Sequence, residues 1–207
     1  MKPILIACSM LEDEIQHIMG EEHLTYPVVW MERGLHEFPE KLHTQLQEEI
    51  VLLERDYDTI LLGYCRCGNV WRGLMSPCAA LAAIDCDDCV HMLLGKGQCD
   101  YRSLYFAGGW LRSERFIGKE YRAAREKYGV CKAERIYQRL LSGYTHLRMI
   151  DTGAYDLSRY QKDAIDTAKC LKLQFAVQQG DLSLLREFLT FRWNGHVAAS
   201  EPGFPLS

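Results

Sequence analysis

Short runs of apolar, often β-branched residues alternate along this chain with longer segments in which apolar residues recur every three or four positions. The short runs predict buried strands. The periodic segments predict amphipathic helices that cover the strands. We place strands at residues 3–7, 26–31, 58–64, 79–84, 103–106, 146–150 and 173–177.

The predicted helices fill the spaces between these strands. They begin near Leu11, at Pro39 and at Val90, and three more are predicted at 118–142, 157–168 and 182–191. Strict alternation of strand and helix is typical of a parallel sheet with helices on both faces. We therefore predict a Rossmann-like α/β fold with a mostly parallel sheet of about six to seven strands. No linker stands out, so residues 1–207 are predicted to form one domain, with a loop-like tail from about 195.

Composition and charge narrow the class of protein. Apolar residues make up 48% of the 207 residues, which suffices for a substantial core. The formal net charge is −4 and gives no basic footprint for nucleic acid or an anionic membrane. The apolar run near the amino terminus is too short for an export signal or a membrane span. We expect a soluble cytoplasmic protein.

The nine cysteines are the best indication of chemistry. Without an export signal, disulfides are disfavoured, and metal ligation or catalysis gains weight. Two pairs, Cys65 with Cys67 and Cys86 with Cys89, directly follow the third and fourth predicted strands, and Cys8 follows the first. Four others are scattered and are expected to be small buried hydrophobic residues, namely Cys78, Cys99, Cys131 and Cys170.

The carboxyl ends of parallel strands meet at one edge of a sheet, where open α/β sheets bind their ligands. Thiolates from three separate loops would leave one position of a metal, or one iron of a [4Fe–4S] cluster, open to a substrate. Cys8 and Cys89 also precede or begin helices, which is expected to lower their pKa. The plainer interpretation is that these cysteines only pack at strand ends.

Other candidate residues follow the same edge. His36 could be a ligand, a proton donor or a loop histidine without a task. Asp87 and Asp88 are candidate acids or hydrogen-bond partners of ligands. Asn69 and Trp110 are candidates for contact with a cofactor, although a tryptophan is more often part of a core. The spacing of the cysteines differs from that of a closed zinc ribbon, and no dinucleotide fingerprint is present.

A set of short motifs in a fixed order resembles one known family, the domain-of-unknown-function family numbered 1638. The motifs are CSMLEDEI, LHEFPEKL, GYCRCGN, DCDDCVHMLLG, YFAGGW, KYGVCKAE, MIDTGAYD and GDLSLL, and the resemblance spans Ile6 to about Gly203. The resemblance implies that Cys8, Cys67 and Cys89 are the family cysteines. It also places a family aspartate on Asp88 and a family tryptophan on Trp110.

The sequence departs from the family pattern in two ways. The family histidine falls on Asp87, which changes or removes a ligand or acid there. Cys65 and Cys86 are additional thiols. The family often occurs beside corrinoid-dependent methyltransferase systems of anaerobes, so the resemblance implies methyl-group metabolism with a corrinoid protein or methyltransferase as a partner.

Three functions remain open, besides an α/β domain with no metal. The first is an enzyme in which Cys8, Cys67 and Cys89 bind a [4Fe–4S] cluster that acts on a small-molecule substrate. The second is a zinc-thiolate enzyme of the methyltransferase type. The third is a metal, corrinoid or redox accessory protein without catalysis of its own. Three soft ligands from three loops favour the first.

Overall fold

The computed structural model describes residues 1–95 and 99–207, and the chain divides into two compact units. Unit 1 comprises Met1–Gly95 and Asp181–Ser207, and unit 2 comprises Lys96–Gly180. This division does not test the prediction of a single domain, because it describes packing within the chain and not independent folding. Each unit is described by itself.

Unit 1 is built on a five-stranded sheet whose order is β2-β1-β3-β4-β8. Its first four strands run parallel, and β8 pairs antiparallel with β4. The strands are β1 (Pro3–Cys8), β2 (Val28–Met31), β3 (Thr59–Gly63), β4 (Ala80–Ile84) and β8 (Val197–Ser200). The helices are η1 (Ser9–Leu11), α1 (Glu12–Glu21), η2 (Leu35–Glu37), α2 (Pro39–Leu53), α3 (Cys89–Leu94) and α8 (Ser183–Leu189).

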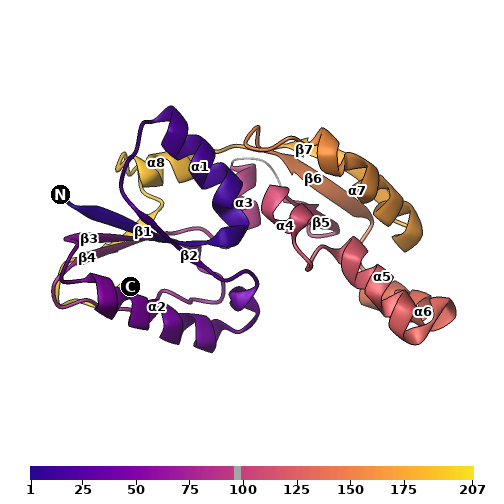
Figure 1. The fold of residues 1–207 in the computed structure, drawn as a ribbon, viewed down its shortest axis with the longest axis horizontal. Helices are drawn as coiled ribbons and strands as arrows, with labels where there is room; N and C mark the ends of the chain where they lie inside the picture. Colours follow the sequence, from indigo (N-terminus) through magenta and orange to yellow (C-terminus); the bar gives the residue numbers. More distant parts are fainter. Residues whose placement is uncertain (96–98) are drawn as a thin grey trace. The chain divides into compact units, whose positions relative to one another are not determined.

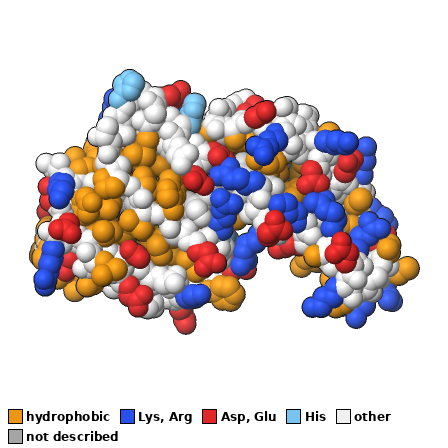
Figure 2. Space-filling model, in the orientation of Figure 1, with side chains coloured by type: hydrophobic (Ala, Val, Ile, Leu, Met, Phe, Trp, Pro, Cys, Tyr) orange, Lys and Arg blue, Asp and Glu red, His pale blue; other side chains and the backbone are white. Residues whose placement is uncertain are grey.

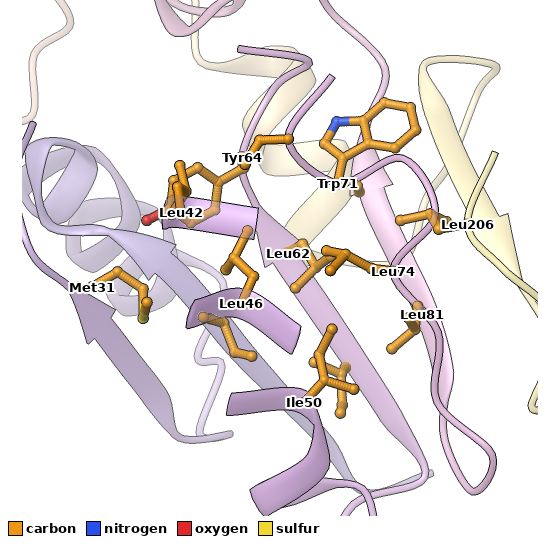
Figure 3. Close-up of a cluster of buried hydrophobic side chains, with 14 of the residues drawn as sticks. Met31, Leu42, Leu46, Ile50, Leu62, Tyr64, Trp71, Leu74, Leu81 and Leu206 are labelled. Atoms are coloured by element: carbon orange, nitrogen blue, oxygen red, sulfur yellow. The ribbon is translucent and has the colours of Figure 1, made fainter. Parts of the chain in front are cut away.

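Helices cover both faces of this sheet, with α2 on one face and α1, α3 and α8 on the other (Figure 1). The apolar stripe of α2 consists of Leu42, Leu46 and Ile50, all fully buried, as the spacing of four residues predicts. They pack on alternate side chains of the strands, among them Ile60 and Leu62 (Figure 3). The intervening strand residues are also buried, because they face the other helix layer.

Unit 2 contains a three-stranded parallel sheet in the order β5-β6-β7. The elements are β5 (Ser103–Phe106), α4 (Gly108–Arg112), α5 (Ile117–Tyr128), α6 (Val130–Leu140), β6 (His146–Asp151), α7 (Ser158–Leu171) and β7 (Gln174–Gln179). Its core joins strand residues such as Leu147 and Met149 to Phe116 of the α4–α5 connection and to Ala164 and Ala168 of α7. Side chains from α5 and α6 complete it.

The mixed α/β class and the mostly parallel strands are confirmed, but three details differ from the sequence predictions. The described strands form two sheets of five and three, not one sheet of six to seven. The predicted helix at 118–142 is broken at Gly129, whose φ of +80° ends α5. The tail predicted to be loop-like from about 195 contributes β8, whose four residues are too few for a clear period-two pattern. No described helix has the length and apolar character needed to cross a membrane.

Candidate thiol site at the carboxyl edge of the unit 1 sheet

Cys8 is the last residue of β1 and lies immediately before the short helix η1. Its side chain is mostly buried, and this burial raises the pKa of the thiol above its usual value. The backbone N–H of Met10, the charge of Arg33 and the hydroxyl of Tyr64 oppose the increase without cancelling it. The expectation that a helix N-terminus lowers the pKa of Cys8 is therefore wrong, because desolvation outweighs the amide dipoles.

The turn after β3 holds two cysteines in an unusual backbone conformation. Cys67, Gly68 and Asn69 all have positive φ angles, of 40°, 81° and 66°. A non-glycine residue tolerates this region at a cost, and asparagine tolerates it better than most. Three such residues in succession turn the chain sharply. The turn thereby brings Cys67 back to the sheet edge.

Two backbone hydrogen bonds join this turn to the turn after β4. The N–H of Arg66 donates to the carbonyl of Cys86 at 2.8 Å, and the N–H of Cys67 donates to the carbonyl of Asp87 at 3.2 Å. The Cys-x-Cys and Cys-x-x-Cys segments therefore lie side by side through their backbones, independently of any side-chain contact.

Cys89 is the first residue of α3 and is partly buried. Asp88 caps this helix, because its carboxylate accepts the backbone N–H of His91 at 2.8 Å. Burial raises the pKa of Cys89 well above its usual value, and the neighbouring thiolates of Cys67 and Cys8 raise it further. The expected lowering of the pKa at this helix N-terminus is also wrong.

Cys8, Cys67 and Cys89 converge. Burial raises the pKa of Cys67 to about 12, and repulsion from the Cys8 thiolate and from Asp88 adds to the effect. Each of the three thiols is thus electrostatically coupled to at least one of the others, although they come from three different strand ends. The sequence prediction that topology brings these residues together is consistent with this geometry. Neighbouring thiolates repel each other here, and a positive charge placed among them would offset that repulsion.

Cys65 and Cys86 form a second pair beside these three thiols, and the charges of Cys89 and Cys67 also raise the pKa of Cys65. Cys65 is buried, its thiol lies 3.9 Å from the sulfur of Met92, and it donates a hydrogen bond toward Cys86. This bond is the main reason that the pKa of Cys86 is lowered to about 7, with the backbone N–H groups of Asp87 and Asp88 contributing. For the same reason the pKa of Cys65 is raised well above its usual value.

The rim of the site is charged. Arg66 lies between the two cysteines of its turn and pairs with Asp85 at 2.8 Å and with Asp87 at 3.4 Å. The ring of His91 lies 2.9 Å from Asp88, through Nδ1, and the carboxylate raises the pKa of the imidazole. All three ion pairs join partly exposed side chains, so they orient these side chains more than they stabilise the fold.

Tyr64 directly follows β3 and belongs to the core cluster (Figure 3). Its hydroxyl is buried and lies near enough to Cys8 for each group to affect the pKa of the other, but it makes no well-formed hydrogen bond within the described residues. Burial raises the pKa of this phenol, followed by repulsion from Cys8 and Cys67. A buried hydroxyl of this kind can donate a hydrogen bond to a thiolate or to a bound ligand.

Four side chains on this edge were not selected from the sequence, namely Arg33, Tyr64, Arg66 and His91. Tyr64 and Arg66 flank Cys65 within the GYCRCGN motif, and His91 stands three residues after Asp88, a spacing typical of a helix cap and its partner. Those local signals could have identified three of the four. Arg33 has no such signal, because its contact with Cys8 depends on β2 lying beside β1.

The other predicted residues divide into two groups. Asp88 and Asp87 lie on the edge, although Asp87 contributes chiefly its backbone carbonyl and an exposed ion pair. His36 is exposed on η2, and none of the described interactions joins it to a thiol. Asn69 is exposed and serves the turn. Trp110 lies on α4 in unit 2, where it packs against the core of that unit.

The scattered cysteines behave differently from the expectation of burial. Cys78, Cys131 and Cys170 are exposed, so that expectation is wrong for them. Cys131 and Cys170 lie on outward faces of α6 and α7, where no packing constraint selects a small apolar residue. They serve as natural controls for the cysteines of the site.

The donor set suits a soft metal, but the arrangement is not a finished coordination shell. Within residues 1–95 and 99–207, no three His, Cys, Asp or Glu side chains are already placed to hold a metal ion. Three partly buried thiols with raised pKa values and a nearby phenol nevertheless have the chemistry of thiolate ligation, because a cation would stabilise the deprotonated forms.

Comparison with known proteins gives one match. The model of the family described as "Protein of unknown function (DUF1638)" matches residues 30–189. No curated protein and no solved structure was found to match the chain. The matched span includes the turns that carry Cys67 and Cys89, and the description names no activity.

Proposed function

The chain belongs to the DUF1638 family of proteins of unknown function, and from its own residues we propose that it is a metal-thiolate enzyme acting on a small molecule. Cys8, Cys67 and Cys89 are the proposed ligands, and a [4Fe–4S] cluster is the proposed cofactor. One observation carries the proposal: three thiols from three strand ends are partly buried close together, and the charges of Cys8 and Cys67 oppose the ionisation of their neighbours.

The electrostatics of the thiols support a bound cation. A thiolate in a desolvated site needs a positive partner, and among the described residues Arg33 is the only positively charged side chain that lowers the pKa of any of the three proposed ligands, that of Cys8. Binding of a cation would release the three protons and replace mutual repulsion by attraction. A lone packing role offers no reason to gather ionisable groups that destabilise each other's charged forms.

The unit 1 sheet supports this location. We infer that the unit is Rossmann-like, since its parallel strands follow the order β2-β1-β3-β4. In such sheets the ligand crevice lies where the strand order reverses, between β1 and β3. Cys8 ends β1, and Cys67 lies in the turn after β3. The β4 turn with Cys89 is the next neighbour.

A cluster is favoured over zinc because all three proposed ligands are thiolates. A catalytic zinc commonly includes a histidine, and the position of the family histidine is Asp87 here. When bound by three cysteines, a cluster supplies an iron with one open position that can act as a Lewis acid. The protein's own groups would supply the proton chemistry.

Specific roles follow for the surrounding residues. Asp88 orients His91 through Nδ1, so that the imidazole is a proposed proton donor at the rim. The hydroxyl of Tyr64, which lies near Cys8, is a proposed hydrogen-bond donor to a thiolate or to an oxygen of the substrate. Arg66, held by Asp85 and Asp87, is placed to attract an anionic substrate. His36 and Asn69 remain weaker candidates, because they make no described contact with the thiols.

Two alternatives remain proposals as well. A zinc-thiolate enzyme would use the same three cysteines to activate a thiol or water. A non-catalytic accessory protein would carry a metal, corrinoid or electrons for a methyltransferase. The methyl-group role, and a corrinoid protein or methyltransferase as partner, rest on the family resemblance alone.

The experiment is metal analysis of protein purified and reconstituted without oxygen. We expect iron and acid-labile sulfide near four each per chain for a [4Fe–4S] cluster, with visible charge-transfer absorbance. C8S, C67S and C89S should each abolish stable loading. C78S, C131S and C170S are matched controls, because these exposed cysteines should be replaceable without loss.

The outcomes separate the candidates. Stoichiometric zinc that is lost in the same three variants would replace the cluster by zinc. Loading with no turnover of any small molecule, but tight binding to a corrinoid protein, would favour the accessory role. Protein that binds neither iron nor zinc, or that loads equally well in all six variants, would overturn the metal proposal.

A further inference from the structure

The two units carry opposite charges, which the net charge of the whole chain conceals. Residues 96–180 contain 16 Lys and Arg against 9 Asp and Glu, a formal charge of +7, whereas the rest of the chain contains 8 against 19, a formal charge of −11. Figure 2 shows Lys and Arg side chains gathered over the part of the chain that includes α5 and α6. Such asymmetry is typical of a chain that binds a charged partner.

The positive charge of unit 2 is concentrated on the α5–α6 hairpin. Five of its cations take part in no ion pair with any described residue, namely Arg125, Lys127, Lys132, Arg135 and Arg139. Lys127 and Lys132 both lie over the ring of Tyr128, at 5.2 and 5.0 Å from its centre. Leaving so many like charges together costs electrostatic energy, which an acidic partner would recover.

Apolar side chains are interleaved with these cations along one face of α6. Lys132, Ile136 and Leu140 follow one another at a spacing of four, and Arg135 and Arg139 lie beside them. Ile136 is 41% exposed and Leu140 is 64% exposed. A helix face of aliphatic and basic residues suits an apolar, acidic protein surface better than a nucleic acid, because phosphates gain nothing from aliphatic contact.

The chain itself contains such a surface on α2, in unit 1. The outward face of α2 forms a shallow apolar hollow that includes Glu48, Val51 and Leu52. Val51 is 56% exposed and Leu52 is 70% exposed. Glu48 in the hollow and Glu49 at its flank add two carboxylates that take part in no ion pair among the described residues. The outward face of α2 thus combines acidic and aliphatic side chains, whereas that of α6 combines basic and aliphatic ones.

We propose that the basic, apolar face of α6 docks on the acidic, apolar face of α2 of a second copy of this chain. The occupant is a second copy because the complementary charge and the complementary aliphatic pair are both present on the chain. One helix-on-helix contact is small against the roughly 1,200 Å² that stable interfaces bury. Reciprocal docking, α6 of each copy on α2 of the other, doubles the contact and closes the assembly as a dimer.

The dimer is expected to be weak and salt-sensitive, because exposed ion pairs contribute to it and the apolar area is modest. Sedimentation equilibrium of the full chain, at low salt and across a wide range of protein concentration, should show a monomer–dimer equilibrium. Raising the ionic strength should weaken the dimer at least tenfold in Kd.

Charge exchange tests the specific faces. R135E/R139E on α6 and E48R/E49R on α2 should each weaken the dimer at least tenfold. Combining the four substitutions restores opposite charges across the contact and should recover most of the affinity. K162E/K169E on α7 is the matched control, since it makes the same change of charge in the same unit and should leave the equilibrium unchanged. Circular dichroism establishes that each variant is folded.

Three results would overturn the proposal. The first is a chain that stays monomeric at every concentration in low salt. The second is a dimer that K162E/K169E weakens as much as R135E/R139E does, since the change in net charge that they share would then explain both losses. The third is a dimer that is unaffected by R135E/R139E while the hairpin retains nucleic acid, which would assign the basic face to a polyanion.

Discussion

The two units of this chain use the same elements, parallel strands with helices, but to different ends. Unit 1 ends three neighbouring strands with cysteines and surrounds them with Arg66, Asp88 and His91. Unit 2 ends its strands without such a cluster among the described residues and instead presents a basic helical hairpin. The difference shows that the carboxyl edge of a parallel sheet can hold a functional site, but that the residue types in its turns determine whether reactive groups are present there.

The largest expected effect of a single substitution is the loss of a core leucine in either unit. Leu46 of α2 and Leu147 of β6 are both fully buried. L46A and L147A should each lower the free energy of unfolding by about 2–5 kcal/mol, because each leaves a cavity in a packed core. Urea unfolding followed by circular dichroism measures the loss.

L52A is the control for that pair, because Leu52 is 70% exposed and its truncation should change stability by less than about 0.5 kcal/mol. If L147A cost no more than this control, unit 2 would lack the well-packed core that the buried aromatic and aliphatic residues indicate. The two units would then differ in how well their cores are packed.

The second effect concerns close approach of backbone in unit 1. A Cβ on Gly63 would lie 2.9 Å from the Cβ of Ala7, on the adjacent strand. G63A should cost about 1–3 kcal/mol, because two paired strands cannot separate locally. Since Ala7 precedes Cys8, the same variant should reduce metal loading in anaerobic reconstitution.

Two other glycines sharpen this prediction. In unit 2, a Cβ on Gly118 would overlap the side chain of Thr167 and lie 2.8 Å from the ring of Phe116, both of which are buried, so G118A should cost at least as much as G63A. Gly20 of α1 has nothing near its Cβ position, and G20A should stabilise the protein by about 0.5–1 kcal/mol. A G63A variant as stable as G20A would contradict the tight packing of β1 on β3.

The contrast between fold and site shows what sequence can reveal. Hydrophobic periodicity was enough to predict the α/β class and most strands, because burial on both sheet faces selects apolar runs such as Ile60 to Leu62. It could not divide the strands between two sheets, since pairing between distant strands leaves no local pattern. β8 was missed for the same reason, as its register depends on β4 and not on its own four residues.

For the site, topology predicted which cysteines meet but not how they ionise. The pKa values of Cys8 and Cys89 depend on burial by segments distant in sequence, so the helix-terminus argument alone pointed in the wrong direction. The net charge of −4 was similarly uninformative, because opposite charges lie in different units. A net charge summed over the whole chain hides the positive charge of unit 2 and the negative charge of unit 1.

The third prediction compares the two kinds of thiol within unit 1. In metal-free protein, the rate of alkylation of Cys86 should reach half its maximum near pH 7, because Cys65 donates a hydrogen bond to the Cys86 thiolate. C65A removes that donor and should move the profile toward higher pH. Mass spectrometry of the alkylated peptide, across pH 5 to 9 (about the range that brackets the shift), measures it.

Cys67 is the internal comparison, because burial raises the pKa of its thiol to about 12. It should therefore remain unmodified under conditions that alkylate Cys86 completely. Equal rates of alkylation of Cys67 and Cys86 at pH 7 would show that the pKa of a proposed ligand does not differ from that of Cys86.

The smallest effects are expected from surface ion pairs, and they too differ between the units. In unit 1, Arg186 of α8 bonds to Glu21 and Glu22 of α1 at 2.6 and 2.7 Å, and Arg192 lies 3.5 Å from Glu22. In unit 2, Arg122 of α5 pairs with Asp163 of α7 alone, at 2.8 Å. R122A should cost only a few tenths of a kcal/mol, whereas R186A should cost more because it breaks a network.

The pH dependence distinguishes a network from simple packing. The hydrogen bond from Arg186 lowers the pKa of Glu21 below its usual value of 4.5. A depressed carboxyl pKa contributes stability that is present above the unfolded value and is lost as the pH falls through the folded one. The difference in unfolding free energy between wild type and R186A should therefore be constant near neutrality and shrink below about pH 4.5. R186M retains most of the apolar stem but not the charge, so if R186M were as stable as wild type at neutral pH, the contact between α8 and α1 would depend on packing of the stem and not on the ion pairs.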